Sequence, residues 1–94
     1  MEHVPIGSLE THRLTRFVVE RRLALSDAAL LLLSEALADA CRRQTARGQS
    51  VRYLRSTNLP AERRVLCFFE AVNADAVKTV NLNALAPFVS IKAA

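Results

Sequence analysis

The fold is decided by one stretch of the sequence, RRVLCFFEAVNADAVKTVN at residues 63–81. It predicts a strand followed by a helix, because β-favouring residues give way to a short helical pattern that Asn73 can cap. A strand with one exposed face alternates apolar and polar residues, whereas here every residue from Val65 to Phe69 is apolar. Since successive side chains point to opposite faces, both faces of this strand are apolar. We therefore expect two separate layers to cover it.

The other elements follow from the period of the apolar residues and from capping and turn residues. In chain order, the expected elements are a strand at 14–23, a helix at 26–47, strands at 50–58 and 64–70, a helix at 74–85 and a short strand at 88–92. The long helix starts at the N-cap Ser26 and stops at Gly48, and Pro87 ends the second helix. Residues 1–12 are expected to form a flexible N-terminal arm ahead of a single domain at 13–94.

The buried faces of these elements can be assigned from residue spacing. On the long helix, apolar residues recur at spacings of three and four, and two further leucines are expected to widen that stripe. The stripe is Leu30, Leu33, Leu37 and Cys41, and the two leucines are Leu31 and Leu32. Alternation in the strand at 50–58 places Val51, Tyr53 and Arg55 on one face and Arg52, Leu54 and Ser56 on the other. The inward residues of the second helix are Ala76, Val77, Val80 and either Ala84 or Leu85.

The order strand, helix, strand, strand, helix, strand is that of a ferredoxin-like α+β sandwich. In this fold, two helices cover one face of a four-stranded antiparallel sheet and leave the other face bare. One of the two apolar sets of the third strand must then lie on the bare face: either Val65, Cys67 and Phe69, or Leu66 and Phe68. Burying such a side chain is worth about 1.5–3 kcal/mol. We therefore expect a second copy of the chain to cover this face in a homodimer.

The composition is that of a folded chain, because 51% of its 94 residues are hydrophobic and only two are glycine. The longest apolar run, at residues 28–33, is far shorter than the roughly 20 residues of a membrane span. No secretory signal is visible at the N-terminus, so we expect a cytoplasmic protein without membrane contact. Eleven of the thirteen basic residues are arginines, and the net charge of +4 permits contact with anions or nucleic acid without requiring it.

Several classes of chemistry are excluded by absent motifs. The sequence has no G-x-x-x-x-G-K or G-x-G-x-x-G phosphate-binding loop, no C-x-x-C and no H-E-x-x-H. Its two cysteines, Cys41 and Cys67, are expected to be small buried hydrophobic residues rather than a disulfide or reactive thiols. RNA-recognition domains share this topology, but their glycine-rich and aromatic signature is absent from RRVLCFFEA, so a nucleic-acid partner is not expected.

Three stretches resemble a family of small ferredoxin-like bacterial domains. They are RFVVERRL at 16–23, VRYLRSTNLPAERRVLCFFEA at 51–71 and ADAVKTVNLNALAPFVSI at 74–91. The family is catalogued as a domain of unknown function, and its best-known member is a nickel-binding protein. The most specific shared pattern is W/Y-x-x-S … C-x-[FY]-E-A, represented here by Tyr53, Ser56, Cys67, Phe69, Glu70 and Ala71. The resemblance implies a homodimer and makes nickel the candidate cofactor.

The histidines of this chain depart from the family's pattern. Family members usually carry a histidine in or just after the second helix, where this chain has Asn81 and Asn83. The only histidines here are His3 and His12, in or beside the N-terminal arm. Because nickel and zinc sites favour imidazole or thiolate ligands, His3 and His12 are the candidate metal ligands of this chain.

The candidate ligand-binding residues are Glu70, Tyr53, Arg55 and Cys67. Glu70 ends the third strand, where it either pairs with a neighbouring arginine such as Arg55 or serves as a ligand or general base with a raised pKa. Tyr53 either has a structural role, with its hydroxyl on a carboxylate or at the dimer seam, or lines a small-molecule pocket with Arg55 and Glu70. An arginine in such a pocket would favour an acidic ligand.

Two functions follow from these assignments. The first is a non-enzymatic, ferredoxin-like homodimer that binds a small molecule or a metal ion such as nickel. The second is a small enzyme of isomerase, cyclase or monooxygenase type, by analogy with dimeric barrels of this fold. The enzyme requires an enclosed cavity on which Glu70, Tyr53 and Arg55 converge, whereas the binding protein does not. The sequence leaves open whether the chain is an enzyme.

Overall fold

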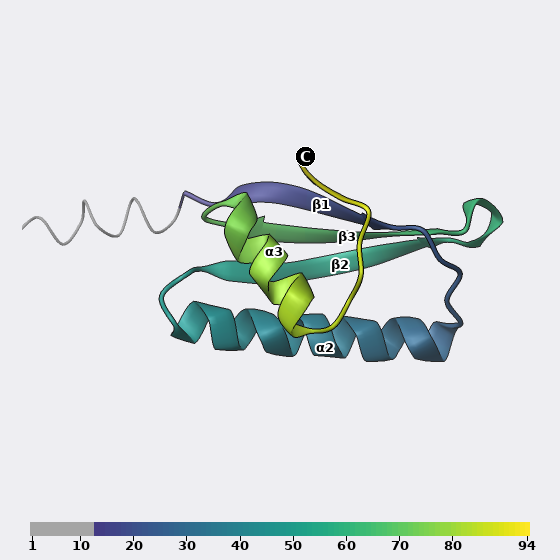
Figure 1. Cartoon of the computed structure of the whole chain (residues 1–94), viewed down its shortest axis with the longest axis horizontal. Helices are drawn as coiled ribbons and strands as arrows, with labels where there is room; N and C mark the ends of the chain where they lie inside the picture. Colours follow the sequence, from purple (N-terminus) through teal and green to yellow (C-terminus); the bar gives the residue numbers. More distant parts are fainter. Residues whose placement is uncertain (1–12) are drawn as a thin grey trace, which may run out of the picture.

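The computed structural model describes residues 13–94 and has the expected order of elements (Figure 1). Along the chain the elements are β1 (Thr15–Arg21), α2 (Asp27–Ala46), β2 (Val51–Leu59), the short 3₁₀ turn η1 (Pro60–Glu62), β3 (Arg64–Ala71), α3 (Ala74–Asn83) and β4 (Ser90–Ala93). The predicted N-terminal arm, residues 1–12, lies outside the described residues. Within the described part, neither helix combines the length and the apolar character that a membrane span requires.

The strands form one antiparallel sheet in the order β2-β3-β1-β4. Both helices pack against the same side of this sheet, and α3 lies beside α2 (Figure 1). The central strands β1 and β3 are paired from Thr15 opposite Ala71 to Arg21 opposite Val65. α2 packs mainly against β2, and α3 packs beside α2 and contacts β3 and β4. This arrangement confirms the predicted ferredoxin-like α+β sandwich, and residues 13–94 leave one face of the sheet uncovered.

Both helices begin at the predicted N-caps. The Ser26 hydroxyl accepts a hydrogen bond from the Ala29 backbone N–H at 3.1 Å, and the Asn73 side chain accepts one from that of Ala76 at 2.9 Å. Each bond satisfies one of the N–H groups that the start of a helix leaves without a partner. α2 is followed by Gly48, whose φ of +103° is a conformation that residues with a side chain rarely adopt. The predicted stop of the helix is therefore confirmed.

The core lies between the two helices and the inner face of the sheet. Alternate residues of β3 are fully buried there, which confirms that one apolar set of this strand packs under the helices. The set is Val65, Cys67, Phe69 and Ala71. It packs with Phe17 and Val19 of β1, Leu37, Ala40 and Cys41 of α2, and Ala76, Val77 and Val80 of α3.

The structure corrects one prediction about helix side chains and decides another. Leu31 and Leu32 are 60% and 67% exposed, so the prediction that they widen the buried stripe is wrong. A helix turns by about 100° per residue, which rotates these two side chains away from the sheet. At the end of α3, Ala84 packs against the core and Leu85 is 88% exposed, so Ala84 is the inward residue of that pair.

A β-bulge in β2 changes which side chains face the helices. Tyr53 and Arg55 pair with the adjacent residues Phe69 and Phe68 of β3, which leaves Leu54 without a partner on that strand. The extra residue shifts the later alternation by one. The later residues on the helix side are Ser56 and Asn58. The prediction that Tyr53 and Arg55 share a face is therefore wrong, because one inserted residue reverses every position after it.

Candidate functional site

One arginine is buried in the core. Arg21, the last residue of β1, follows Phe17 and Val19 at the two-residue period and therefore points to the helix side of the sheet. It is only 2% exposed. Its Nη2 donates a hydrogen bond to Oδ1 of Asn81, a fully buried residue of α3. The pair joins β1 to α3 across the core.

The hydrogen bonding of this arginine is incomplete. Nε and Nη1 of Arg21 are buried and have no hydrogen-bond partner among residues 13–94. None of the carboxylates in residues 13–94 forms an ion pair with it. Asn81 donates its own amide N–H to the Val77 carbonyl at 2.8 Å, which orients its oxygen toward the guanidinium. A buried charge without a counter-charge destabilises a folded protein. Packing alone therefore does not account for an arginine at this position.

The guanidinium of Arg21 keeps an unmatched positive charge at neutral pH. Burial lowers its pKa below the ordinary value, and the nearby Cys67 thiol and Tyr53 hydroxyl oppose that shift. An arginine side chain nevertheless stays protonated near neutral pH. Burial also raises the pKa of Cys67, against the opposing effects of Arg21 and the Ser56 hydroxyl. A protonated thiol carries no charge, so Cys67 does not neutralise the guanidinium.

Arg21 lines a partly open cleft of about 390 Å³ at one end of the interface between helices and sheet, which we call the Arg21 cleft. Its walls come from the end of β1, the β1–α2 connection, the first half of α2 and the α3–β4 connection. They include Leu25, Leu33, Leu85 and Phe88. Apart from Arg21 and Arg22, every lining residue is apolar. An apolar cleft with one buried polar anchor is typical of a small-molecule site.

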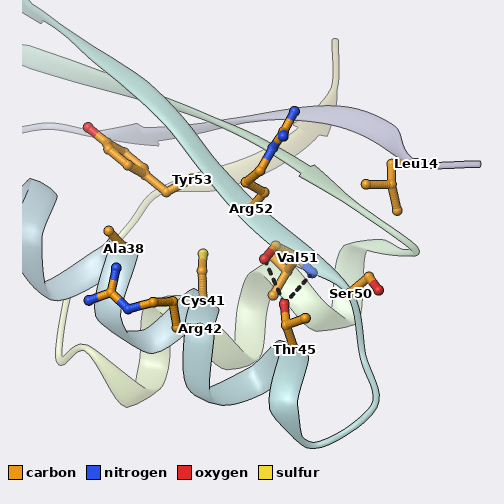
Figure 2. A pocket seen from close by; sticks show the side chains of 9 residues that line it. All are labelled: Leu14, Ala38, Cys41, Arg42, Thr45, Ser50, Val51, Arg52 and Tyr53. Carbon is orange, nitrogen blue, oxygen red and sulfur yellow. Dashed lines mark hydrogen bonds between the residues drawn. The ribbon is translucent and has the colours of Figure 1, made fainter. Parts of the chain in front are cut away.

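A second cleft, of about 490 Å³, lies between the C-terminal half of α2 and the edge strand β2 (Figure 2). The Thr45 hydroxyl donates to the Val51 carbonyl at 3.0 Å and accepts from the Val51 N–H at 3.1 Å, so it joins the helix to the start of the strand. Cys41 points from α2 toward the sheet (Figure 2), and burial raises the pKa of its thiol to about 11. At neutral pH this thiol is therefore protonated and a poor nucleophile.

The charged side chains of this second cleft already have partners. Arg42 pairs with Asp39 at 2.5 Å, and Arg52 pairs with Glu70 at 2.6 Å. Both arginines are about 70% exposed, so water also solvates them. Arg21 is only 2% exposed and pairs with no carboxylate of residues 13–94, and this contrast makes the Arg21 cleft the better candidate site.

Tyr53 and Cys67, two of the four predicted ligand-binding residues, lie inside the sandwich. The Tyr53 hydroxyl forms hydrogen bonds with Ser34 Oγ at 2.9 Å and with Ser56 Oγ at 2.7 Å. The Ser56 hydroxyl in turn donates to Cys67 Sγ at 3.0 Å. The tyrosine hydroxyl thus meets serines rather than the predicted carboxylate. These four side chains form one hydrogen-bonded chain from α2 across β2 to β3.

Arg55 and Glu70, the other two predicted residues, lie on the opposite face of the sheet. The Arg55 guanidinium lies 4.3 Å from the centre of the Phe68 ring, in a cation–π contact. Glu70 pairs with Arg52 and, at 3.5 Å, with Arg16, because the strand register places it between them. The prediction that Glu70 pairs with neighbouring arginines is confirmed, but its partners are Arg16 and Arg52 rather than Arg55. The enzyme hypothesis required Glu70, Tyr53 and Arg55 to converge on one cavity, and in this chain Tyr53 lies on the face opposite the other two.

The predicted metal ligands, His3 and His12, lie outside the described residues. Among residues 13–94, no group of three or more His, Cys, Asp or Glu side chains could hold a metal ion. Cys41 and Cys67 are both buried and free, which confirms the prediction that neither forms a disulfide.

The sheet face opposite the helices, which we call the open face, has an apolar centre and a charged rim. Leu66 and Phe68, the second apolar set of β3, lie at the centre beside Val18, and all three are half-buried. The charged residues of the face are Arg16, Glu20, Arg52, Arg55, Arg64, Glu70 and Lys92. The open face is therefore the bare face that the sequence predicted.

The Arg21–Asn81 pair was not predicted from the sequence. The available signal for Arg21 is its position two residues after Val19 in an alternating strand, which predicts an inward side chain. The signal for Asn81 is its position four residues after Val77 on the buried stripe of a helix. Neither signal shows that the two residues meet, because 60 positions separate them along the chain.

Comparisons with known proteins support the fold. No protein-family model matches the chain, and no curated protein sequence matches it. Among solved structures, the chain is similar to SCO4226 from Streptomyces coelicolor A3(2), with a TM-score of 0.73 and 18% sequence identity. The match covers 84% of this chain and 94% of the Streptomyces chain. At this identity the likeness shows the fold alone, a ferredoxin-like arrangement of two helices on a four-stranded antiparallel sheet.

Proposed function

We propose that this chain is a small-molecule-binding protein that works as a homodimer, with the Arg21 cleft as its binding site. The observation that carries the proposal is the cleft itself. Its volume of about 390 Å³ lies within the usual range of ligand pockets, about 300–1,000 Å³, and its walls are apolar. Two of its walls are the β1–α2 and α3–β4 connections, and binding residues are commonly found on loops that a rigid core holds in place.

The residues that line the cleft favour binding over catalysis. Proton transfer at neutral pH needs a group whose pKa lies near 7, such as a histidine or a perturbed carboxylate. The lining residues include neither, and their only ionisable groups are the guanidiniums of Arg21 and Arg22. The residues that an enzyme would need, Tyr53, Arg55 and Glu70, lie on two different faces of the sheet.

The open face supports the homodimer. Its apolar centre, Val18, Leu66 and Phe68, is only half-buried within one chain. The surrounding charges have both signs, so a second copy packed around a two-fold axis would place carboxylates as well as basic side chains at the rim of the interface. Full burial of each apolar side chain would contribute up to about 1.5–3 kcal/mol.

Nickel remains part of the proposal through the family resemblance. The candidate ligands are His3 and His12, outside the described residues. An organic molecule in the Arg21 cleft and a metal ion on the histidines are separate predictions, and one measurement can detect either.

Native mass spectrometry of the full chain, purified without a tag or chelator, tests the proposal. We expect a dimer that carries an organic molecule or, if nickel binds, a mass that EDTA removes. A monomer at micromolar concentration would contradict the homodimer. An empty dimer that shows no thermal shift with a panel of apolar small molecules would contradict the binding site.

Matched variants separate the two parts of the proposal. Phe68→Glu places a charge at the centre of the open face and should give a monomer, whereas Leu31→Glu, at an exposed position of α2, should remain a dimer. Ala29→Phe fills the Arg21 cleft and should abolish ligand binding. Its control is Ala28→Phe, at the exposed neighbouring position, which should bind as the unmodified chain does.

A further inference from the structure

We propose that the Arg21 cleft selects organic monocarboxylates with an apolar body, and that Arg21 binds the carboxylate group. This inference rests on the proposed function and extends it, because it names the class of ligand and the residue that recognises it.

Three N–H groups of Arg21 supply the recognition. Nη1 carries two N–H groups and Nε carries one, and neither nitrogen has a hydrogen-bond partner in the described part of the chain. Both nitrogens are buried, so a ligand must displace part of the cleft wall to reach them. Nη2 is held by Asn81, whose orientation is fixed in turn by the Val77 carbonyl. The guanidinium is therefore already oriented before a ligand arrives, which lowers the entropy lost on binding. A carboxylate supplies acceptor oxygens for such donors together with the opposite charge.

The charge of the cleft selects a monoanion. A neutral acceptor such as an alcohol or a water molecule would satisfy the N–H groups but leave the positive charge uncompensated. Arg22, the other arginine at the cleft, is 70% exposed and lies 3.3 Å from Glu20, so it adds no free buried charge. One buried cation matches one negative charge. A phosphate dianion or a dicarboxylate would bring a second charge with no partner among the apolar walls.

The remaining walls select the rest of the ligand. Leu25, Leu33 and Phe88 line the same cleft as Arg21 and offer hydrocarbon and aromatic surface to a ligand. Apolar surface removed from water stabilises a complex by about 25 cal/mol per Å². A hydrocarbon chain or an aromatic ring attached to the carboxylate would therefore bind more tightly than a small acid such as acetate.

Titration calorimetry with two matched ligand pairs tests the inference on the full chain. The pairs are octanoate with octanol and naphthoate with naphthamide, each of which keeps the apolar body and changes the charge. We expect each acid to bind about tenfold more tightly than its neutral partner, or better, because hydrogen bonds to charged groups are the stronger ones. Acetate should show no measurable binding under the same conditions.

Two substitutions assign the selectivity to Arg21. Arg21→Met should remove the preference for octanoate over octanol, and it should leave the melting temperature of the free protein equal or higher because a buried unpaired charge is gone. Asn81→Asp places a carboxylate of the chain itself beside the guanidinium. It should raise the melting temperature of the free protein and weaken octanoate binding about tenfold, with octanol unchanged. Asn83→Asp, at an exposed position of the same helix, is the matched control and should alter neither value.

The outcomes of these experiments distinguish the carboxylate inference from the proposed function. Equal affinities for the acids and their neutral partners would overturn the inference while leaving the proposed function in place. No binding by any member of the two pairs would contradict both. If Arg21→Met does not fold, Asn81→Asp alone decides: an unchanged octanoate affinity in that variant would mean that Arg21 does not bind the carboxylate.

Discussion

Arginines on the two faces of the sheet have opposite surroundings. On the open face, Glu70 lies between Arg16 and Arg52, pairs with both, and shares with them contact with water. On the helix face, Arg21 is 2% exposed and meets one neutral amide, that of Asn81. Exposed ion pairs contribute about 0–1 kcal/mol each, whereas a buried unpaired charge is strongly unfavourable. This difference indicates that a ligand would pair with the buried Arg21 rather than with the exposed Arg16 or Arg52.

The contrast between a buried and an exposed face also holds for two neighbouring phenylalanines of β3. Phe68 and Phe69 are neighbours on β3, but Phe69 is fully buried under the helices and Phe68 lies on the open face beneath Arg55. The two rings therefore test what each face contributes to stability.

The largest effect is expected from Phe69→Ala. It should lower the free energy of unfolding by about 3–5 kcal/mol, because a fully buried ring is replaced by a cavity. Phe68→Ala should have a smaller effect that depends on protein concentration, since its main packing partner in our proposal is a second copy of the chain. Urea unfolding at two protein concentrations measures both. Losses of equal size that do not depend on concentration would remove the distinction between the faces.

A smaller effect is expected in alkaline solution, from the buried thiol of Cys41. Burial raises its pKa from the ordinary 9.0 to about 11, so the unfolded chain loses this proton before the folded chain does. The contribution of Cys41 to stability is complete below pH 9 and is lost as the pH rises to about 11. The loss is on the order of 2 kcal/mol.

Urea unfolding across that pH range checks the prediction. Stability should fall less steeply in Cys41→Ala than in the unmodified chain. Cys67, whose pKa is also raised, contributes to both curves alike. Parallel curves for the two proteins would show that Cys41 titrates normally.

A smaller loss in the free energy of unfolding is expected from Tyr53→Phe. The substitution removes a hydroxyl that is bonded to Ser34 and Ser56, at a cost of about 1–2 kcal/mol. Because these groups belong to one hydrogen-bonded chain, the double variant Tyr53→Phe with Ser34→Ala should lose less than the sum of the single losses. Additive losses, measured by chemical unfolding, would argue against the connected chain.

The smallest effect is expected from Glu70→Gln. Its pairs with Arg16 and Arg52 are largely exposed, so the loss should stay below about 1 kcal/mol and shrink as salt is added. Octanoate binding should not change, because Glu70 and the Arg21 cleft lie on opposite faces of the sheet. Weaker binding in this variant would show that the two faces are coupled.

Features that depend on neighbouring residues could be predicted. The N-caps Ser26 and Asn73 and the stop at Gly48 were each recognisable from residue type and position. The two apolar faces of residues 65–69 were visible from alternation alone. Hydrogen bonds that cap a helix and side chains that alternate along a strand span only a few residues, so their signal is local.

The bulge at Leu54 and the candidate site could not be predicted in this way. A bulge is a property of two paired strands, and nothing in residues 51–59 alone shows where the register shifts. Its effect was large, because it sent Arg55 to the face opposite Tyr53, with which it was expected to line one pocket.

By itself, the sequence determined the element order, the two-faced third strand and hence the ferredoxin-like class. Only the tertiary structure decided that Arg21 meets Asn81 across 60 positions and lines an apolar cleft, with no carboxylate of residues 13–94 paired to it. The physical reason is the range of the interactions. Periodicity and capping are set within one element, whereas the surroundings of a buried charge are set by how a helix and two loops pack onto a sheet.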